Sequence, residues 1–229
     1  MEKSANKKML AGVLAIILIV MAFSFVQTEE TMKKGSTQYV VAIDPGHGGF
    51  DPGKVGVSGA LEKDINLSIS WKVKQQLEKK GIQVIMTRTT DQGLYAEGER
   101  NKKSADMRNR VETIQASGAA IAVSIHQNSF TDTVSKGSQV FYYNGSKEGQ
   151  RLANRIQNSI KETLKDDNHR VEKGNSDYYM LRKVTCPIVI VECGFLSNPM
   201  EEALLMEEDY QEKIAKGISK GIIQYLTEE

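Results

Sequence analysis

The chain has 229 residues, and its 30 lysine and arginine residues nearly balance 29 aspartate and glutamate residues. This balance excludes a protein that is drawn to nucleic acid or to an anionic membrane by its overall charge. A hydrophobic fraction of 40% with only 4 prolines excludes a disordered chain, and the length suits one α/β domain with a short extension.

The extension lies at the N-terminus. Lys7 and Lys8 precede an apolar run at 9–26, and residues 27–37 form a polar linker. A bilayer core needs roughly 17–25 apolar helical residues, whereas the apolar region of a secretory signal is about 7–15 residues long. We therefore expect residues 1–26 to be a signal anchor, with a cleaved signal peptide as the alternative. Because the lysines flank the run on its N-terminal side, the rest of the chain is predicted to lie outside the cytoplasm, membrane-anchored or secreted.

Residues 38–229 alternate between short apolar runs and amphipathic stretches. In chain order, the expected elements are a strand at 39–43, a helix at 62–80, a strand at 82–86, a helix at 104–115, strands at 119–125 and 139–143, a helix at 147–164, strands at 178–181 and 188–191, and a helix at 210–226. Apolar strands that alternate with helices are typical of a twisted, mostly parallel sheet flanked by helices. The predicted fold class is therefore α/β, in a single domain preceded by one N-terminal apolar helix.

The two cysteines, Cys186 and Cys193, are predicted to be free. Both fall on one apparent strand, in which seven residues of extended chain span about 23 Å. A disulfide needs its two Cα atoms within about 7 Å of each other. We expect both cysteines to be small buried hydrophobic residues.

Residue types that bind metals stand where three of the expected strands end. His47 follows the first strand in a glycine-rich loop, and His126 and Glu192 each follow a buried apolar run. Glu62 stands in the first turn of the helix after the glycine-rich loop. Because ligands bind at the carboxyl ends of the strands in such sheets, we expect these four side chains to converge on one rim.

This set has the composition of a catalytic zinc site. Two neutral imidazoles and one carboxylate can hold zinc and leave a position open for water, and a second carboxylate is needed to take a proton from that water. Each residue also has an ordinary alternative: His47 in a surface turn, His126 in the core, Glu62 as an acid favoured at a helix N-terminus, and Glu192 in an ion pair. The third histidine, His169, lies in a polar loop and is expected to be solvated.

A phosphate-binding loop is the rival interpretation of the glycines at 46–49. Their spacing is not G-x-G-x-x-G, and no Lys-Ser or Lys-Thr follows as in a P-loop. The H-E-x-x-H motif of zincins is also missing from the sequence. The glycines instead favour a sharp turn that leaves room for a substrate beside His47.

Five segments together resemble a known enzyme family. In chain order they are VAIDPGHGG at 41–49, LEKDINL at 61–67, MTR at 86–88, SIHQN at 124–128 and VECGFLSN at 191–198. Their sequence, order and spacing resemble those of the zinc-dependent N-acetylmuramoyl-L-alanine amidases. The resemblance implies an α/β fold and hydrolysis of the amide between the lactyl group of N-acetylmuramic acid and L-alanine in peptidoglycan.

The resemblance also implies a role for each site residue. His47, Glu62 and His126 are implied to hold one Zn²⁺ ion, and Glu192 is implied to be the catalytic carboxylate. For Arg88, in the third segment, two alternatives stay open. Its guanidinium could bind a carboxylate of the stem peptide bidentately, or it could form a structural ion pair.

Within the family, the chain is similar to the germination-specific amidases of the spore cortex, since it has one apolar N-terminal segment, no wall-binding repeats and the stretch YYML at 178–181. This similarity implies a role in muramic δ-lactam formation and germination, and a location in the forespore intermembrane space or cortex. The expected partners are peptidoglycan and, through an uncleaved segment, the membrane, but not nucleic acid; an accessory protein is left open. Two alternatives remain: a zinc peptidase that cuts within the stem peptide, and a non-catalytic cell-wall-binding protein.

Overall fold

The computed structural model describes residues 39–228. The predicted signal segment at 1–26 and the linker at 27–37 lie outside the described residues. Within residues 39–228, no helix combines the length and the apolar character needed to cross a membrane.

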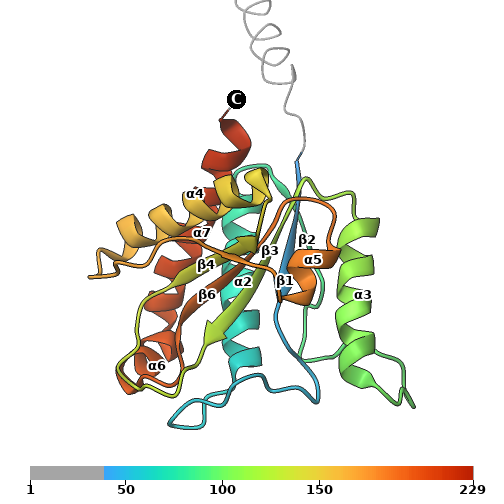
Figure 1. Ribbon diagram of the computed structural model, residues 1–229, viewed down its shortest axis with the longest axis horizontal. Coiled ribbons are helices and arrows are strands. Elements are labelled where there is room, and N and C mark those ends of the chain that lie inside the picture. Colours follow the sequence, from blue (N-terminus) through green and yellow to red (C-terminus); the bar gives the residue numbers. More distant parts are fainter. Residues whose placement is uncertain (1–38, 229) are drawn as a thin grey trace, which may run out of the picture. The chain divides into compact units, whose positions relative to one another are not determined.

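A six-stranded sheet forms the middle layer of this part of the chain (Figure 1). In spatial order its strands are β2 (Gln83–Met86), β1 (Val40–Pro45), β3 (Ile121–Asn128), β6 (Ile188–Phe195), β4 (Gln139–Tyr143) and β5 (Lys173–Asn175). β4 pairs antiparallel with β6, and the other neighbouring strands described here pair parallel. The predicted α/β class with a mostly parallel sheet is therefore confirmed.

Helices cover both faces of the sheet (Figure 1). The helices are α2 (Glu62–Glu78), α3 (Lys102–Ala116), α4 (Lys147–Leu164), α5 (Tyr179–Lys183), α6 (Pro199–Met206) and α7 (Glu208–Thr227). α2, α4 and α7 pack on one face, and α3 and α5 pack on the other. The strands are apolar on both sides for this reason: Val41 and Ile43 join the first core, and Ala42 between them joins the second.

Helix α7 packs closely against α4 at two glycines. A Cβ atom on Gly217 would lie 2.7 Å from the Cα of Ile160, and one on Gly221 would lie 2.5 Å from the Cα of Ile156. These glycines flank the buried Ser219 in a G-x-S-x-G pattern. The nucleophile of a serine hydrolase with that pattern stands on a turn between a strand and a helix, so here the pattern serves helix packing.

The predicted strand at 178–181 is wrong, because Tyr178 is the N-cap of the short helix α5 and residues 179–181 lie within that helix. A run of four apolar residues is too short for periodicity to separate a strand from a helix. The sequence pattern also leaves β5 and α6 unpredicted. The start of α6 does have a signal, since Asn198 caps it by accepting from two backbone N–H groups and Pro199 occupies its first turn.

Candidate metal centre

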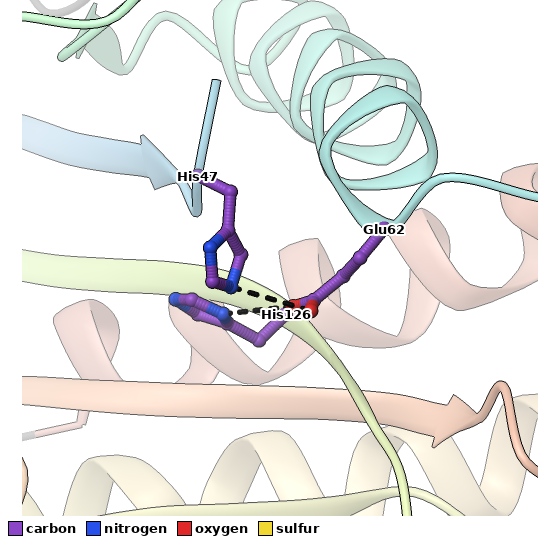
Figure 2. Close-up of side chains that lie close together, drawn as sticks. All are labelled: His47, Glu62 and His126. Carbon is purple, nitrogen blue, oxygen red and sulfur yellow. Dashed lines mark hydrogen bonds and ion pairs between the residues drawn. The ribbon is translucent and has the colours of Figure 1, made fainter. Parts of the chain in front are cut away.

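Three side chains from separate elements meet at the carboxyl end of the sheet (Figure 2). His47 lies in the loop after β1, Glu62 is the first residue of α2, and His126 lies within β3. His47 Nε2 is 3.2 Å from Glu62 Oε2, and His126 Nδ1 is 3.0 Å from Glu62 Oε1. One ligand atom from each residue lies within 4.8 Å of the other two. The structure therefore brings these three residues together in a group that could hold a metal ion.

Glu62 is buried, and the main chain fixes its orientation. Its Oε2 accepts a hydrogen bond of 2.8 Å from the backbone N–H of Lys54, and its Oε1 accepts one of 3.1 Å from that of Gln127. Burial would raise the pKa of Glu62, but hydrogen bonds and charges of His126 and His47 outweigh it and hold that pKa well below its usual range. Glu62 is therefore an ionised carboxylate with a fixed direction, as a metal ligand must be.

Asp51 fixes the imidazole of His47. The Oδ2 atom of Asp51 lies 3.0 Å from Nδ1 of His47, so Nε2 is the nitrogen that faces Glu62. A carboxylate on one ring nitrogen sets the tautomer and leaves the other nitrogen available to a metal. The backbone at His47 has a φ of 62°, which is the left-handed region that non-glycine residues rarely adopt.

A buried arginine of α3 holds the backbone that carries His47. Arg110 is 1% exposed and donates hydrogen bonds to the carbonyl oxygens of His47 and Pro45. The same guanidinium forms an ion pair of 2.7 Å with the buried carboxylate of Asp44. Arg110 therefore links α3 to the strand end and holds His47 in its left-handed conformation. The sequence does not distinguish it from Arg108, which lies two residues away and is exposed.

Arg88 is 1% exposed and does not line the cavity over the candidate metal centre. Its guanidinium donates to four backbone carbonyls, those of Pro45, Gly46, Lys63 and Thr90. These bonds leave no free pair of N–H groups for a substrate carboxylate, and no carboxylate within residues 39–228 pairs with the guanidinium directly. In this arrangement Arg88 holds the loop that carries His47.

Glu192 lines the same cavity as His47, Glu62 and His126, and the cavity has a volume of about 500 Å³. It pairs in register with His126 on the neighbouring strand, and both strands run further than predicted. Its Oε2 is buried and has no hydrogen-bond partner among the described residues. Burial raises the pKa of Glu192 to about 7, although His126 acts in the opposite direction. Glu192 is thus a carboxyl group that can exchange a proton near neutral pH.

Two glycines make room for these side chains. A Cβ atom on Gly46 would collide with the imidazole ring of His126. One on Gly53, which has a φ of 70°, would lie 2.5 Å from Oε2 of Glu62. The space beside His126 and Glu62 therefore depends on positions that lack a side chain.

The remaining candidates lie away from the centre. The side chain of His169 is 87% exposed and pairs with Asp167, as expected for a solvated loop residue. Cys186 and Cys193 are both free, as predicted. Cys193 is buried, but Cys186 is only partly buried, because it precedes β6 and does not lie on that strand.

The sequence and the fold match known proteins. The sequence model of the N-acetylmuramoyl-L-alanine amidase family matches residues 41–224. The germination-specific N-acetylmuramoyl-L-alanine amidase of Bacillus subtilis is 38% identical over 192 residues, which cover 82% of this chain and 80% of that relative. The CwlD amidase from Clostridioides difficile, solved in complex with the GerS lipoprotein, has a TM-score of 0.80 and 40% identity, covering 82% of this chain and 98% of that one. An N-acetylmuramoyl-L-alanine amidase from Clostridium difficile 630 has a TM-score of 0.75 and 34% identity, covering 85% and 100%.

Proposed function

The chain belongs to the N-acetylmuramoyl-L-alanine amidase family, and from this premise we propose that His47, Glu62 and His126 hold one Zn²⁺ ion while Glu192 acts as the general base. The reaction is hydrolysis of the amide that joins the lactyl group of N-acetylmuramic acid to L-alanine. Family membership decides against the two alternatives, a peptidase that cuts within the stem peptide and a non-catalytic wall-binding protein.

The observation that supports this assignment is that two carboxyl groups of one cavity differ in their contacts. Glu62 is in contact with both histidines, whereas the Oε2 of Glu192 has no partner among the described residues. Two imidazoles and one carboxylate are a known ligand set for catalytic zinc, which keeps its fourth position for water. A fourth protein ligand would close that position, so the unpartnered carboxyl group suits a role in proton transfer.

The chemistry divides between the metal and the chain. A zinc ion, when bound, acidifies a water molecule and polarises a carbonyl group. Glu192 takes the proton of the attacking water, and its pKa of about 7 suits this role at neutral pH. It then returns that proton to the leaving nitrogen of L-alanine. Asp51 and the backbone donors to Glu62 keep the ligands in place while the charges change.

Digestion of purified peptidoglycan tests this proposal. The protein should release L-alanine amino termini and free lactyl carboxylates in equal amounts. A chelator should abolish both products, and added zinc should restore them. New amino termini further along the stem peptide would indicate a peptidase, and full activity after complete metal removal would exclude the zinc assignment.

We also propose that the substrate is spore-cortex peptidoglycan and that cleavage allows muramic δ-lactam to form. The support is the identity with the Bacillus subtilis germination-specific amidase and with CwlD. Cortex and vegetative sacculi should be digested side by side, and cortex should be cleaved faster. Equal rates on the two sacculi would remove this part of the proposal.

The place of action is proposed to be outside the cytoplasm, on the support of the apolar run at 9–26 behind Lys7 and Lys8. The solved CwlD was in complex with the GerS lipoprotein. We propose that the present chain also binds a lipoprotein similar to GerS, encoded in the organism from which this chain comes. Such a lipoprotein should form a complex with the purified domain on size exclusion, and separate elution of the two proteins would contradict it.

A further inference from the structure

The cavity over the metal centre has two walls that differ in charge. The first lies on the β1 side of β3, where the loop after β1 and the start of α3 contribute Lys54 and Lys103. The second lies on the β6 side, where the end of β3 and the start of α5 contribute Ser129 and Tyr178. Apart from Glu192 at the proposed catalytic centre, the second wall has no acidic or basic side chain among the described residues.

The two lysines of the first wall are available to a ligand. Both are exposed, and neither forms an ion pair within residues 39–228. The acidic groups of that wall are already engaged, since Asp51 contacts His47 and Asp106 pairs with Arg110. The first wall therefore presents two unpaired positive charges to the cavity.

Both lysines line the same cavity as the proposed metal ligands. Lys54 and Lys103 border it together with His47, Glu62 and His126. Their charges therefore face the space in which a substrate would lie.

The second wall is neutral and partly aromatic. The ring of Tyr178 packs edge-to-face on Phe141 with 5.5 Å between ring centroids, and 36% of the residue stays exposed. Ser129 adds a hydroxyl group to the same wall. A rigid aromatic surface with neutral hydrogen-bonding groups beside it suits a sugar ring, which has apolar C–H faces and hydroxyl groups but no charge.

The scissile amide joins two unlike arms, an uncharged N-acetylated sugar and a peptide that has free carboxylates. We propose that Lys54 and Lys103 bind carboxylates of the peptide arm, and that Tyr178 binds the sugar arm. The assignment rests on the proposed function, since it orients that substrate over His47, Glu62 and His126. In this assignment, two exposed lysines bind the substrate carboxylates, a role for which the buried Arg88 has no free pair of N–H groups.

A pair of substrates that differ only in charge tests this assignment. One is a disaccharide linked through the lactyl group to L-alanyl-D-glutamate, and the other is its diamide. The zinc-loaded protein should cleave the charged substrate with the higher kcat/KM, mainly through a lower KM. Lys103→Met and Lys54→Met should each reduce this preference by about two- to fivefold, the range that one exposed ion pair supplies. Added salt should weaken the preference, because it screens exposed charges.

Two further variants separate the walls. Tyr178→Ala should lower kcat/KM for both substrates by the same factor and leave the preference unchanged. Lys147→Met removes the charge of an exposed lysine that does not line the cavity, and it should change neither rate. Zinc content should be equal in all variants, because none of these side chains is a proposed ligand.

The outcomes keep the two proposals apart. If the charged and the neutral substrate are cleaved equally well, or if the preference survives the double lysine variant, the carboxylate subsite is wrong while the amidase mechanism stands. If the zinc-loaded protein cleaves neither substrate at the lactyl amide, the proposed function itself fails and the subsite fails with it.

Discussion

Glu192 and His126 are register partners on the parallel strands β6 and β3, and both line one cavity, yet only His126 contacts Glu62. On neighbouring strands, a histidine of the candidate metal centre thus lies opposite a carboxyl group whose Oε2 atom is buried and has no hydrogen-bond partner among the described residues. The proposed roles of ligand and base follow from this difference, and the first two predictions test it.

Metal content should depend on the two histidines of the centre. The purified protein should contain about one zinc per chain, as a three-ligand catalytic site requires. His47→Ala and His126→Ala should each lose most of it, measured by elemental analysis of the purified variants. His169→Ala is the matched control, because its side chain is 87% exposed, and it should keep the metal. Full zinc occupancy in both site variants would disprove the ligand assignment.

Replacing Glu192 by glutamine should separate catalysis from metal binding. The amide has nearly the shape of the carboxylate, so the fold and the zinc should be kept. Turnover should fall at least about 100-fold, the lower end of what a general base supplies. Zinc content and amide cleavage need to be measured on the same preparation.

Glu62→Gln is the matched comparison for that variant. Because Glu62 is in contact with both histidines, its loss should lower zinc affinity together with activity. A metal-free Glu192→Gln protein, or one that cleaves at nearly the wild-type rate with zinc bound, would contradict the proposed division of roles.

Arg110→Met should destabilise the fold by about 3–5 kcal/mol, because it leaves the carboxylate of Asp44 buried without its partner. Urea unfolding of metal-free protein measures this loss. The exposed neighbour gives the control, and Arg108→Met should change stability by less than about 0.5 kcal/mol. The double variant with Asp44→Asn should lose less than the sum of the single losses. Additive losses would show that the buried pair is not coupled.

The stability of the domain should fall in acid partly through Asp44. Burial would raise the pKa of Asp44, but Arg110 and the hydroxyl groups of Ser124 and Thr87 lower it from 3.8 to about 2. Because the folded pKa lies below the unfolded one, this contribution is complete above about pH 4 and is lost as the pH falls through 2. A shift of this size corresponds to about 2 kcal/mol.

Unfolding of metal-free wild type and Asp44→Asn between pH 2 and pH 5 checks this contribution. The difference in free energy of unfolding between the two proteins should shrink by about 2 kcal/mol toward pH 2, while the contributions of other groups cancel. A difference that stays constant with pH would mean that Asp44 has an ordinary pKa in the folded protein.

The N-terminal segment should export the domain. A reporter that is active only outside the cytoplasm should be active when it is fused to the C-terminus of the full chain. Replacing Lys7 and Lys8 by glutamate should reduce that activity, because the positive charges orient the segment. Activity of a reporter that works only in the cytosol would contradict the predicted location.

Local patterns were enough to find the parts of the site that follow strands. An apolar run followed within a few residues by a histidine or a glutamate predicts both the strand and a polar side chain near its carboxyl end, as for His47, His126 and Glu192. The helix at 147–164 was predicted with its observed bounds, because its apolar residues recur at helical spacing. In the structure, Ser146 caps its start. Where a strand stops is less local: β3 and β6 continue through the site because they pair with each other there, with His126 opposite Glu192 and Asn128 opposite Phe195.

Tertiary packing decides what the sequence left open. Arg108 and Arg110 lie on one polar helix, and only the rotation of α3 against the sheet buries the second of them. Arg88 belongs to a segment that resembles the family, but no spacing rule reveals that its donors go to backbone carbonyls. The short helix α5 and the three-residue strand β5 are stabilised by contacts with distant elements, so their own residues give little signal.

The left-handed backbone at His47 lowers the stability of the fold, whereas the proposed activity needs the imidazole at this position. A non-glycine residue in such a conformation costs about 1–3 kcal/mol, and glycine adopts it almost freely. A laboratory selection for thermal stability alone would therefore favour glycine at position 47, and each such gain would come with the loss of an imidazole from the centre. The domain that folds most stably and the domain that can work on the cell wall are, at this position, different sequences.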